Sequence, residues 1–449
     1  MCQLYPFLKF TTMEAAETAK QILQANNRNG YTIPSARLYP FQWNWDAGFH
    51  ALGWMYVDEQ KAFEEVNSMF KGQWKNGMLP HIVFHEKNDA YFPGPAEWDI
   101  SLSEHAPEIA TTGITQLPVF GFIVERMMHY LDEKSSEINV FLEQIYPKIL
   151  ASHRYLYTHR DPANEGLVYI QHNWESTDNS PAWDEALRNV DISSARDVSV
   201  LRKDNKTVHA SQRPTNDNYN RYIHLIYLLK QYQYNDAIIA AFHPFLVQDV
   251  MFNALLIQSN KGLLAVGKKL NKDVTEIEGW ITKATKAMND KLWDEATGFY
   301  YSFDLRLNKK IFVKTSSGLM PLFANICSQT QAQRLVYHIE QSFIKNFDCM
   351  LCPSTAADEK AFDPLKYWRG PIWINVNWML YFGLKKYGFD AMADAVKMDS
   401  IKLVEANGFF EYFDPRPEAT MLKTAGLGAD AFSWTASIYL DFKNNKMLG

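Results

Sequence analysis

Residues 39–56 read YPFQWNWDAGFHALGWMY, a segment rich in aromatic residues that runs directly into a helical pattern. From Asp46 to Tyr56 apolar residues recur at steps of three and four, which is the spacing of an amphipathic helix. The preceding residues combine aromatic rings with amides, and Asp46 adds a carboxylic acid. Such rings can plug a core, but so many amphipathic side chains in eight residues would be wasted there. We therefore expect a loop that lines a site and leads into a helix.

The same alternation of helix and irregular loop continues along all 449 residues. Apolar periodicity predicts a dozen helices, at residues 14–25, 46–56, 60–70, 118–130, 139–157, 219–232, 244–269, 275–292, 331–344, 372–387, 390–406 and 433–442. The segments between them are rich in proline, glycine, asparagine and aromatic residues, notably at 31–45, 77–98, 172–184, 352–371 and 408–428.

Twelve helices joined by alternately short and long connections indicate an all-α fold. We expect an (α/α)6 barrel, a closed ring of six helix pairs whose long loops cover one end. An α-solenoid is the runner-up, but the chain has no motif repeated at a fixed period. No flexible linker or low-complexity run interrupts the alternation, so a single domain over residues 1–449 is predicted.

Composition narrows the range of partners. Hydrophobic residues make up 47% of the chain, and its formal net charge is −6. Lysine and arginine are scattered, which argues against a nucleic-acid-binding or anionic-membrane surface. The expected partner is small or neutral, and the sequence leaves the oligomeric state open, a homo-oligomer included.

No window of 18 or more apolar residues occurs, so we expect no membrane span and a cytoplasmic location. The alternative is a periplasmic or lipid-anchored protein, if a leader once preceded Cys2. Cys349 and Cys352 form a lone CxxC without a second pair at zinc spacing. HExxH, calcium-loop and GxSxG motifs are also missing from the sequence, so no metal and no cofactor is expected.

The first acidic segment, residues 171–184, reads QHNWESTDNSPAWD. Asp178 opens the turn Asp178-Asn179-Ser180-Pro181, which takes this acid out of helical register. An acid beside an indole can stay protonated because it is poorly solvated, and a protonated acid suits donation to a leaving group. The alternative is an aspartate that caps a helix.

The second acidic segment, residues 409–415, reads FFEYFDP. Glu411 is flanked by aromatic residues directly after the helix stop signal Asn407-Gly408, so it is not an acid of a solvated helix face. It suits a general base that activates water, and the alternative is a buried ion-pair partner.

Further aromatic residues come from residues 367–373, YWRGPIW, which end a loop and open a helix. Sugars present flat C–H faces and a rim of hydroxyls, so their sites combine aromatic rings with carboxylates and amides. Arg213 and Tyr219 add donors, and an arginine in such a pocket can grip a carboxylate with two hydrogen bonds. We expect Arg221 to bridge helices instead and leave it out of the site.

Together these motifs resemble glycoside hydrolase family 63, in the order QWNWD (42–46), WES (174–176) with DNSP (178–181), YWRGPIW (367–373), EYF (411–413) and FSWT (432–435). Within that family the chain is most similar to the short bacterial mannosylglycerate and glucosylglycerate hydrolases, over about residues 31–439. The resemblance implies an (α/α)6 barrel and an inverting mechanism. It makes Asp178 the general acid and Glu411 the general base.

The resemblance also implies subsites. The glycone is expected to contact Tyr39, Trp43, Trp45, Asp46, Tyr91, Gly370 and Trp373. The aglycone is expected to contact Gln116, Trp174, Arg213, Tyr219, Tyr367 and Trp368, with Arg213 as the partner of a glycerate carboxylate. The predicted substrate is glucosylglycerate or mannosylglycerate, and the alternative is a neutral disaccharide or glucosylglycerol. One departure is that Thr177 alone separates WES from Asp178, a loop one residue shorter than in the relatives.

Two other classes of protein remain as alternatives. A sugar epimerase or isomerase on the same barrel would use histidines as proton carriers, with His105 and His172 facing each other across the pocket. A carbohydrate-binding protein without catalysis would have one of the two acids missing or misplaced.

Overall fold

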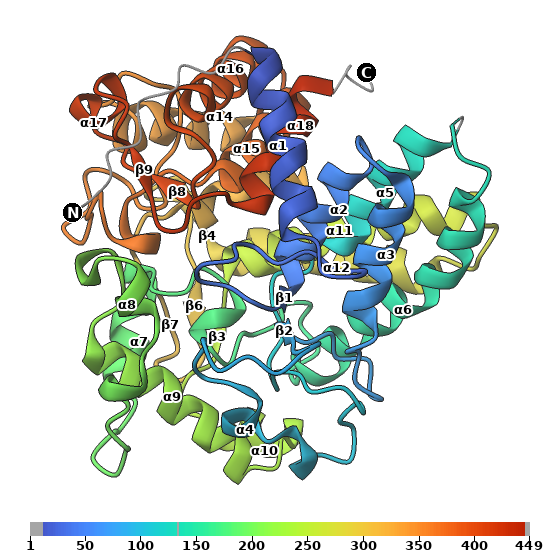
Figure 1. Cartoon of the computed structure of the whole chain (residues 1–449). Helices are drawn as coiled ribbons and strands as arrows, with labels where there is room; N and C mark the ends of the chain where they lie inside the picture. The colour runs from blue at the N-terminus through green and yellow to red at the C-terminus, as the bar shows by residue number, and fades with distance from the viewer. Residues whose placement is uncertain (1–11, 133, 445–449) are drawn as a thin grey trace.

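Helices dominate the structure, a computed structural model that describes residues 12–132 and 134–444 (Figure 1). Within that part of the chain, six helices form a closed ring in which each packs against the next and the last packs against the first. They are α2 (Asn44–Trp54), α5 (Phe120–Leu131), α11 (Val250–Lys269), α13 (Met320–Ala324), α15 (Ile374–Lys386) and α18 (Ser433–Asn444).

A second set of helices covers this ring: α1 (Thr12–Asn26), α3 (Glu59–Phe70), α6 (Ile138–His159), α12 (Thr275–Ala287), α14 (Gln329–His338) and α16 (Asp390–Asn407). Each of these helices precedes one ring helix in the chain, and α1 lies beside α18, which joins the two ends of the described chain (Figure 1). Burial separates the layers, since every residue of α2 is buried whereas α12 buries only Ile277 and Ala284. The paired ring is the predicted (α/α)6 architecture.

Two glycines bring ring helices α5 and α11 together. A β-carbon added at Gly121 would clash with the carbonyl oxygen of Ser259, and one added at Gly262 would clash with that of Gly121. Only residues without a side chain allow two helix backbones to approach this closely.

Gly121→Ala should therefore destabilise the protein by about 1–3 kcal/mol, because overpacking forces α5 and α11 apart. The measurement is chemical denaturation followed by circular dichroism. Gly279→Ala in α12 is the matched control, since no atom lies within 4 Å of its added β-carbon. That change should be neutral or stabilise by up to about 1 kcal/mol through helix propensity. Equal destabilisation by both variants would contradict the packing argument.

The twelve predicted helices are all present, but one of them does not belong to the ring. Helix α9 (Asn216–Gln231) lies with α4 (Pro95–Trp98) and α10 (Asp236–Phe242) in the lower part of Figure 1. Its place in the ring is taken by α13, which was not predicted. The physical reason is that all five residues of α13 are buried, so the segment has no polar face and shows no periodicity.

The predicted helix at residues 244–269 begins later than expected. Val247 and Gln248 form strand β3, and the Asp249 side chain caps α11 by accepting a hydrogen bond from the Phe252 amide. Three further short helices lie in the loops, namely α7 (Asp184–Arg188), α8 (Asp204–Thr207) and α17 (Pro417–Met421).

Short antiparallel strands fasten the loops. Strand β1 (Gln42–Trp43) pairs with β2 (Ile82–Val83), and β8 (Tyr412–Phe413) pairs with β9 (Gly426–Leu427). In a three-stranded sheet, β6 (Phe303–Asp304) lies between β3 (Val247–Gln248) and β7 (Lys309–Lys310). Strand β4 (Trp293–Asp294) pairs with β5 (Phe299–Tyr300). The first two pairs hold the aromatic segments identified in the sequence.

Among the described residues, no helix has both the length and the apolar character needed to cross a membrane. Cys2, on which the lipid-anchored alternative depends, lies outside the described residues. The cytoplasmic location stays a prediction.

Candidate active site

A cavity lies where several ring helices begin. Its wall includes Asp46 in the first turn of α2, Trp434 in the first turn of α18, and Tyr367 and Trp368 shortly before α15. The predicted site residues that line it are Tyr39, Trp43, Trp45, Asp46, Tyr91, Gln116, Trp174, Asp178, Arg213, Tyr219, Tyr367, Trp368 and Glu411. The fold thus gathers residues from loops that are far apart in the chain around one space.

Gly370 and Trp373 are not part of the cavity wall. The Trp373 ring lies behind Trp368, stacked with a centroid distance of 3.8 Å and an interplanar angle of 3°. Gly370 faces the Asp363 carbonyl so closely that a β-carbon would clash with it. Both residues shape the wall from behind, and their contact with a sugar stays a prediction.

The loop around Asp178 is held by its own polar groups. The Asn173 amide donates to the Asp178 carbonyl at 3.0 Å and to its carboxylate Oδ1 at 3.2 Å. The Ser180 side chain caps the short helical turn that follows by accepting a hydrogen bond from the Ala182 amide. Although only Thr177 separates the WES motif from Asp178, Asp178 lines the cavity.

The three acids of this segment have different surroundings. Glu175 is fully buried, pairs with Arg160 at 3.2 Å and accepts the backbone amides of Thr115 and Gln171. Asp184 pairs with Arg369 at 2.7 Å. Asp178 alone of the three lines the cavity. The first two acids therefore fasten the loop.

Burial raises the pKa of Asp178 to about 7, which puts it close to neutrality. The positive charge of Arg213 opposes this shift, and the negative charges of Asp204 and Glu411 add to it. A buried carboxyl group with this pKa can hold a proton near neutral pH and give it to a leaving group.

Glu411 comes from the segment fastened by β8 and β9. Its backbone amide donates to the Ala429 carbonyl at 2.9 Å, and its carboxylate Oε2 accepts the Ala429 amide at 3.2 Å. Gly428 has φ +71°, and a β-carbon there would lie 2.5 Å from that carboxylate oxygen. Glycine at this position therefore allows the glutamate to turn into the cavity.

The Tyr39 hydroxyl donates to Glu411 Oε1 at 2.8 Å. Arg213 in turn donates to the Tyr39 hydroxyl at 3.1 Å. Burial raises the pKa of Glu411 above its ordinary value, and Arg213 and the hydrogen bonds from Tyr39 and the Ala429 amide oppose this shift. Glu411 receives more stabilising contacts as an anion than Asp178 does, which is the asymmetry expected of a base beside an acid.

Asp46 is a third buried carboxyl group in the cavity, in the first turn of α2. Burial raises its pKa well above the usual range, and the nearby charge of Glu411 raises it further. Beside it, the Trp45 amide donates to the Gln116 side chain at 2.9 Å. This corner of the cavity offers carboxyl and amide groups to hydroxyls.

Aromatic rings form much of the wall. Trp45 packs edge-on against Trp434 at 5.2 Å between centroids, and Trp43 packs edge-on against Tyr91 at the same distance. Trp174 lies 6.0 Å from Tyr219. A cavity lined by both aromatic rings and carboxyl groups suits a carbohydrate, whose C–H faces stack on rings and whose hydroxyls need polar partners.

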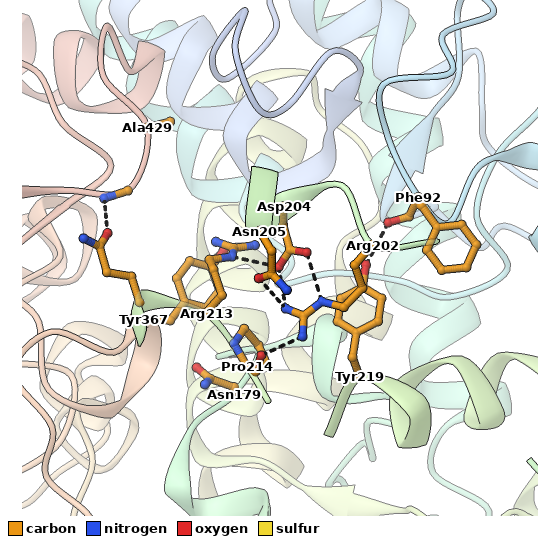
Figure 2. Close-up of polar contacts among 12 residues, drawn as sticks. Phe92, Asn179, Arg202, Asp204, Asn205, Arg213, Pro214, Tyr219, Tyr367 and Ala429 are labelled. Carbon is orange, nitrogen blue, oxygen red and sulfur yellow. Dashed lines mark hydrogen bonds and ion pairs between the residues drawn. The ribbon is translucent and has the colours of Figure 1, made fainter. Parts of the chain in front are cut away.

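Several lining residues were not predicted, among them His81, Phe92, Asp204, Phe432 and Trp434. Phe432 and Trp434 belong to the motif FSWT, so the sequence carried a signal for them. Asp204 had none, because it stands in no recognisable motif and the sequence does not show that Arg202 and Arg213 bind its carboxylate. Figure 2 shows Asp204 between the guanidinium groups of Arg202 and Arg213.

The histidines proposed for an isomerase do not meet in this cavity. His172 is buried and bonded to the Tyr222 carbonyl and the Trp174 amide. His105 is partly exposed beside Glu104. Among the described residues, no cluster of three or more His, Cys, Asp or Glu side chains is arranged to hold a metal ion.

Comparison with known proteins agrees with this geometry. The family described as mannosylglycerate hydrolase MGH1-like glycoside hydrolase domain matches residues 39–435. A mannosylglycerate hydrolase of Thermus thermophilus is 42% identical over 424 residues, which cover 94% of this chain and 99% of that protein. A glucosylglycerate hydrolase of Mycolicibacterium hassiacum is 30% identical over 447 residues, 96% and 98% of the two chains.

Among solved structures, this chain is similar to a GH63 mannosylglycerate hydrolase from Thermus thermophilus in complex with Tris and D-glycerate. The TM-score is 0.89 with 41% sequence identity, over 96% of this chain and 100% of that one. The fold, the acid-lined cavity and these matches define a glycoside hydrolase. The chain belongs to the MGH1-like glycoside hydrolases, so the predicted relation to glycoside hydrolase family 63 is confirmed.

Proposed function

We propose that this enzyme hydrolyses an α-glycoside of glycerate, mannosylglycerate or glucosylglycerate, with inversion at the anomeric carbon. Asp178 donates a proton to the glycosidic oxygen, and Glu411 removes a proton from the attacking water. The observation that carries the proposal is a pair of buried carboxyl groups in one aromatic cavity. Burial raises the pKa of Asp178 to about 7, whereas Glu411 accepts hydrogen bonds from the Tyr39 hydroxyl and the Ala429 amide.

The charge of the cavity supports glycerate as the aglycone. The buried Arg213 lines the cavity, and Lys203 lines it as well. Cationic donors in the wall favour a ligand that brings a carboxylate. The relatives named mannosylglycerate and glucosylglycerate hydrolase, and the D-glycerate complex of the Thermus enzyme, agree with this reading.

The glycone is assigned to the aromatic corner that contains Trp43, Trp45 and Asp46, with Tyr39 and Tyr91 beside it. Asp46 is suited to bind sugar hydroxyls, because its carboxyl group is buried and close to the base. We also propose that the chain works as one catalytic domain, since α1 packs against α18 and residues from loops far apart in the chain meet in one cavity.

The test is hydrolysis of a panel of α-glycosides by the wild-type enzyme, with the product anomer followed by NMR. The panel contains mannosylglycerate, glucosylglycerate, glucosylglycerol, kojibiose, nigerose and trehalose. Release of β-sugar from a glycerate glycoside, at least tenfold faster than from the neutral substrates, is the expected result. Preference for a neutral substrate would refute the role of glycerate, and initial release of α-sugar would refute inversion.

The activity should fall as pH rises through about 7. Asp178 must be protonated to act as the acid, and burial raises its pKa to about 7, so the competent form is lost above that pH. The measurement is kcat/KM on the preferred substrate between pH 4 and pH 9. An activity that keeps rising beyond pH 9 would contradict the assignment of the acid.

A further inference from the structure

Asp204 lies in the cavity wall and pairs with two arginines, Arg202 and Arg213. Arg202 binds both of its carboxylate oxygens, through Nε to Oδ1 at 3.1 Å and through Nη2 to Oδ2 at 2.8 Å. Arg213 donates from Nε to Oδ2 at 3.1 Å. Burial alone would raise the pKa of Asp204, but the two arginines lower it below its usual value, so the group is an anion.

Arg202 is itself firmly held. Its guanidinium donates to the Pro214 carbonyl at 2.9 Å (Figure 2). It also donates to the Asn216 side chain at 2.8 Å and lies 4.4 Å from the centroid of the Tyr219 ring. Arg202 is therefore a fixed partner for the Asp204 carboxylate. The Oδ2 atom of the same carboxylate also accepts the hydrogen bond from Arg213.

From Arg213 the contacts continue to the general base. The Arg213 guanidinium lies over the Tyr367 ring at 4.4 Å and donates to the Tyr39 hydroxyl, which donates to Glu411. Asp204 thus reaches Glu411 through two intervening side chains without lying next to it.

We propose that Asp204 is a positioning residue that orients Arg213 and balances its charge, and so controls how strongly Arg213 acts on the two reacting carboxyl groups. This inference rests on the roles proposed above for Asp178 and Glu411. Arg202 anchors Asp204, and neither residue takes part in proton transfer.

Charge balance is the physical basis of this control. A positive charge nearby favours the ionised form of a carboxyl group, and a negative charge disfavours it. Arg213 lowers the pKa of both Asp178 and Glu411, and Asp204 raises the pKa of Asp178. The other ionisable groups near Asp178 or Glu411 are Tyr39, Asp46, Tyr91, Tyr222, Tyr367 and Tyr412.

The test compares two variants with opposite expected shifts. Asp204→Asn leaves Arg213 uncompensated, so the alkaline limb of kcat/KM should move to lower pH by about half to one unit. Arg202→Gln leaves Asp204 less compensated, so the limb should move to higher pH by a similar amount. Asp217→Asn in α9, an exposed carboxylate paired with Arg221, is the matched control and should leave the limb unmoved.

A purely structural role would lower activity or Tm in both variants without shifting the limb in opposite directions, and that result would overturn the inference. Asp204→Glu keeps the charge, so its limb should stay at the wild-type pH even if its activity falls. The same shifts are measurable without turnover by 13C NMR titration of the Asp178 carboxyl, assigned by its loss in Asp178→Asn. An inactive wild type would refute the proposed function, whereas unmoved titrations would refute the role of Asp204.

Discussion

Asp178→Asn should lower kcat on a glycerate glycoside by about 10³-fold or more, because the leaving oxygen then departs without a proton. The side chain keeps its shape, so the hydrogen bonds that Asn173 gives to the loop can largely remain. KM should change little, and the alkaline limb near pH 7 should disappear. Steady-state kinetics on the wild type and the variant measure both effects.

Leaving-group dependence separates acid catalysis from damage to the fold. An α-glycosyl fluoride needs little protonation to depart, so its hydrolysis by Asp178→Asn should fall far less than that of the natural substrate. Asp191→Asn is the control, because Asp191 is exposed and accepts a hydrogen bond from the nearby Ser193 amide, away from the cavity wall. Equal losses on both substrates would mean that Asp178 is not the proton donor.

The sequence predicted those site residues that stand in unusual local motifs. Asp178 and Glu411 stand in short motifs whose neighbours are unusual, an indole and a proline turn in one case and a row of aromatic residues in the other. Such local patterns identify loops that line a cavity. They do not say which acid of a cluster faces inward, and the structure was needed to separate Asp178 from Glu175 and Asp184.

Residues whose role depends on a side-chain contact and not on a motif were beyond this reasoning. Asp204 stands in no recognisable motif, and its role depends on its contact with Arg213, nine residues further along the chain. Helix α13 was missed for a related reason, since a short buried helix shows no polar face. Trp373 was placed in the glycone subsite by resemblance, and the structure adds that its ring stacks on Trp368, while its contact with a sugar stays a prediction.

Glu411→Gln should also lower kcat by about 10³-fold or more, because the attacking water then has no group to take its proton. Glutamine can still accept the Tyr39 hydrogen bond, so the cavity should keep its shape. The sharper measurement uses azide, an anion that attacks without losing a proton. With an α-glycosyl fluoride, azide should restore turnover in Glu411→Gln and yield the β-glycosyl azide.

This rescue distinguishes the base from the acid, because Asp178→Asn keeps Glu411, whose negative charge should repel azide from the position of the water. Glu418→Gln in α17 is the matched control, since Glu418 is exposed and pairs only loosely with Arg416 at 3.8 Å. It should retain wild-type kcat and show no response to azide. If Glu411→Gln gave no azide product while Asp178→Asn did, the two roles would have to be exchanged, and an α-configured azide would exclude inversion.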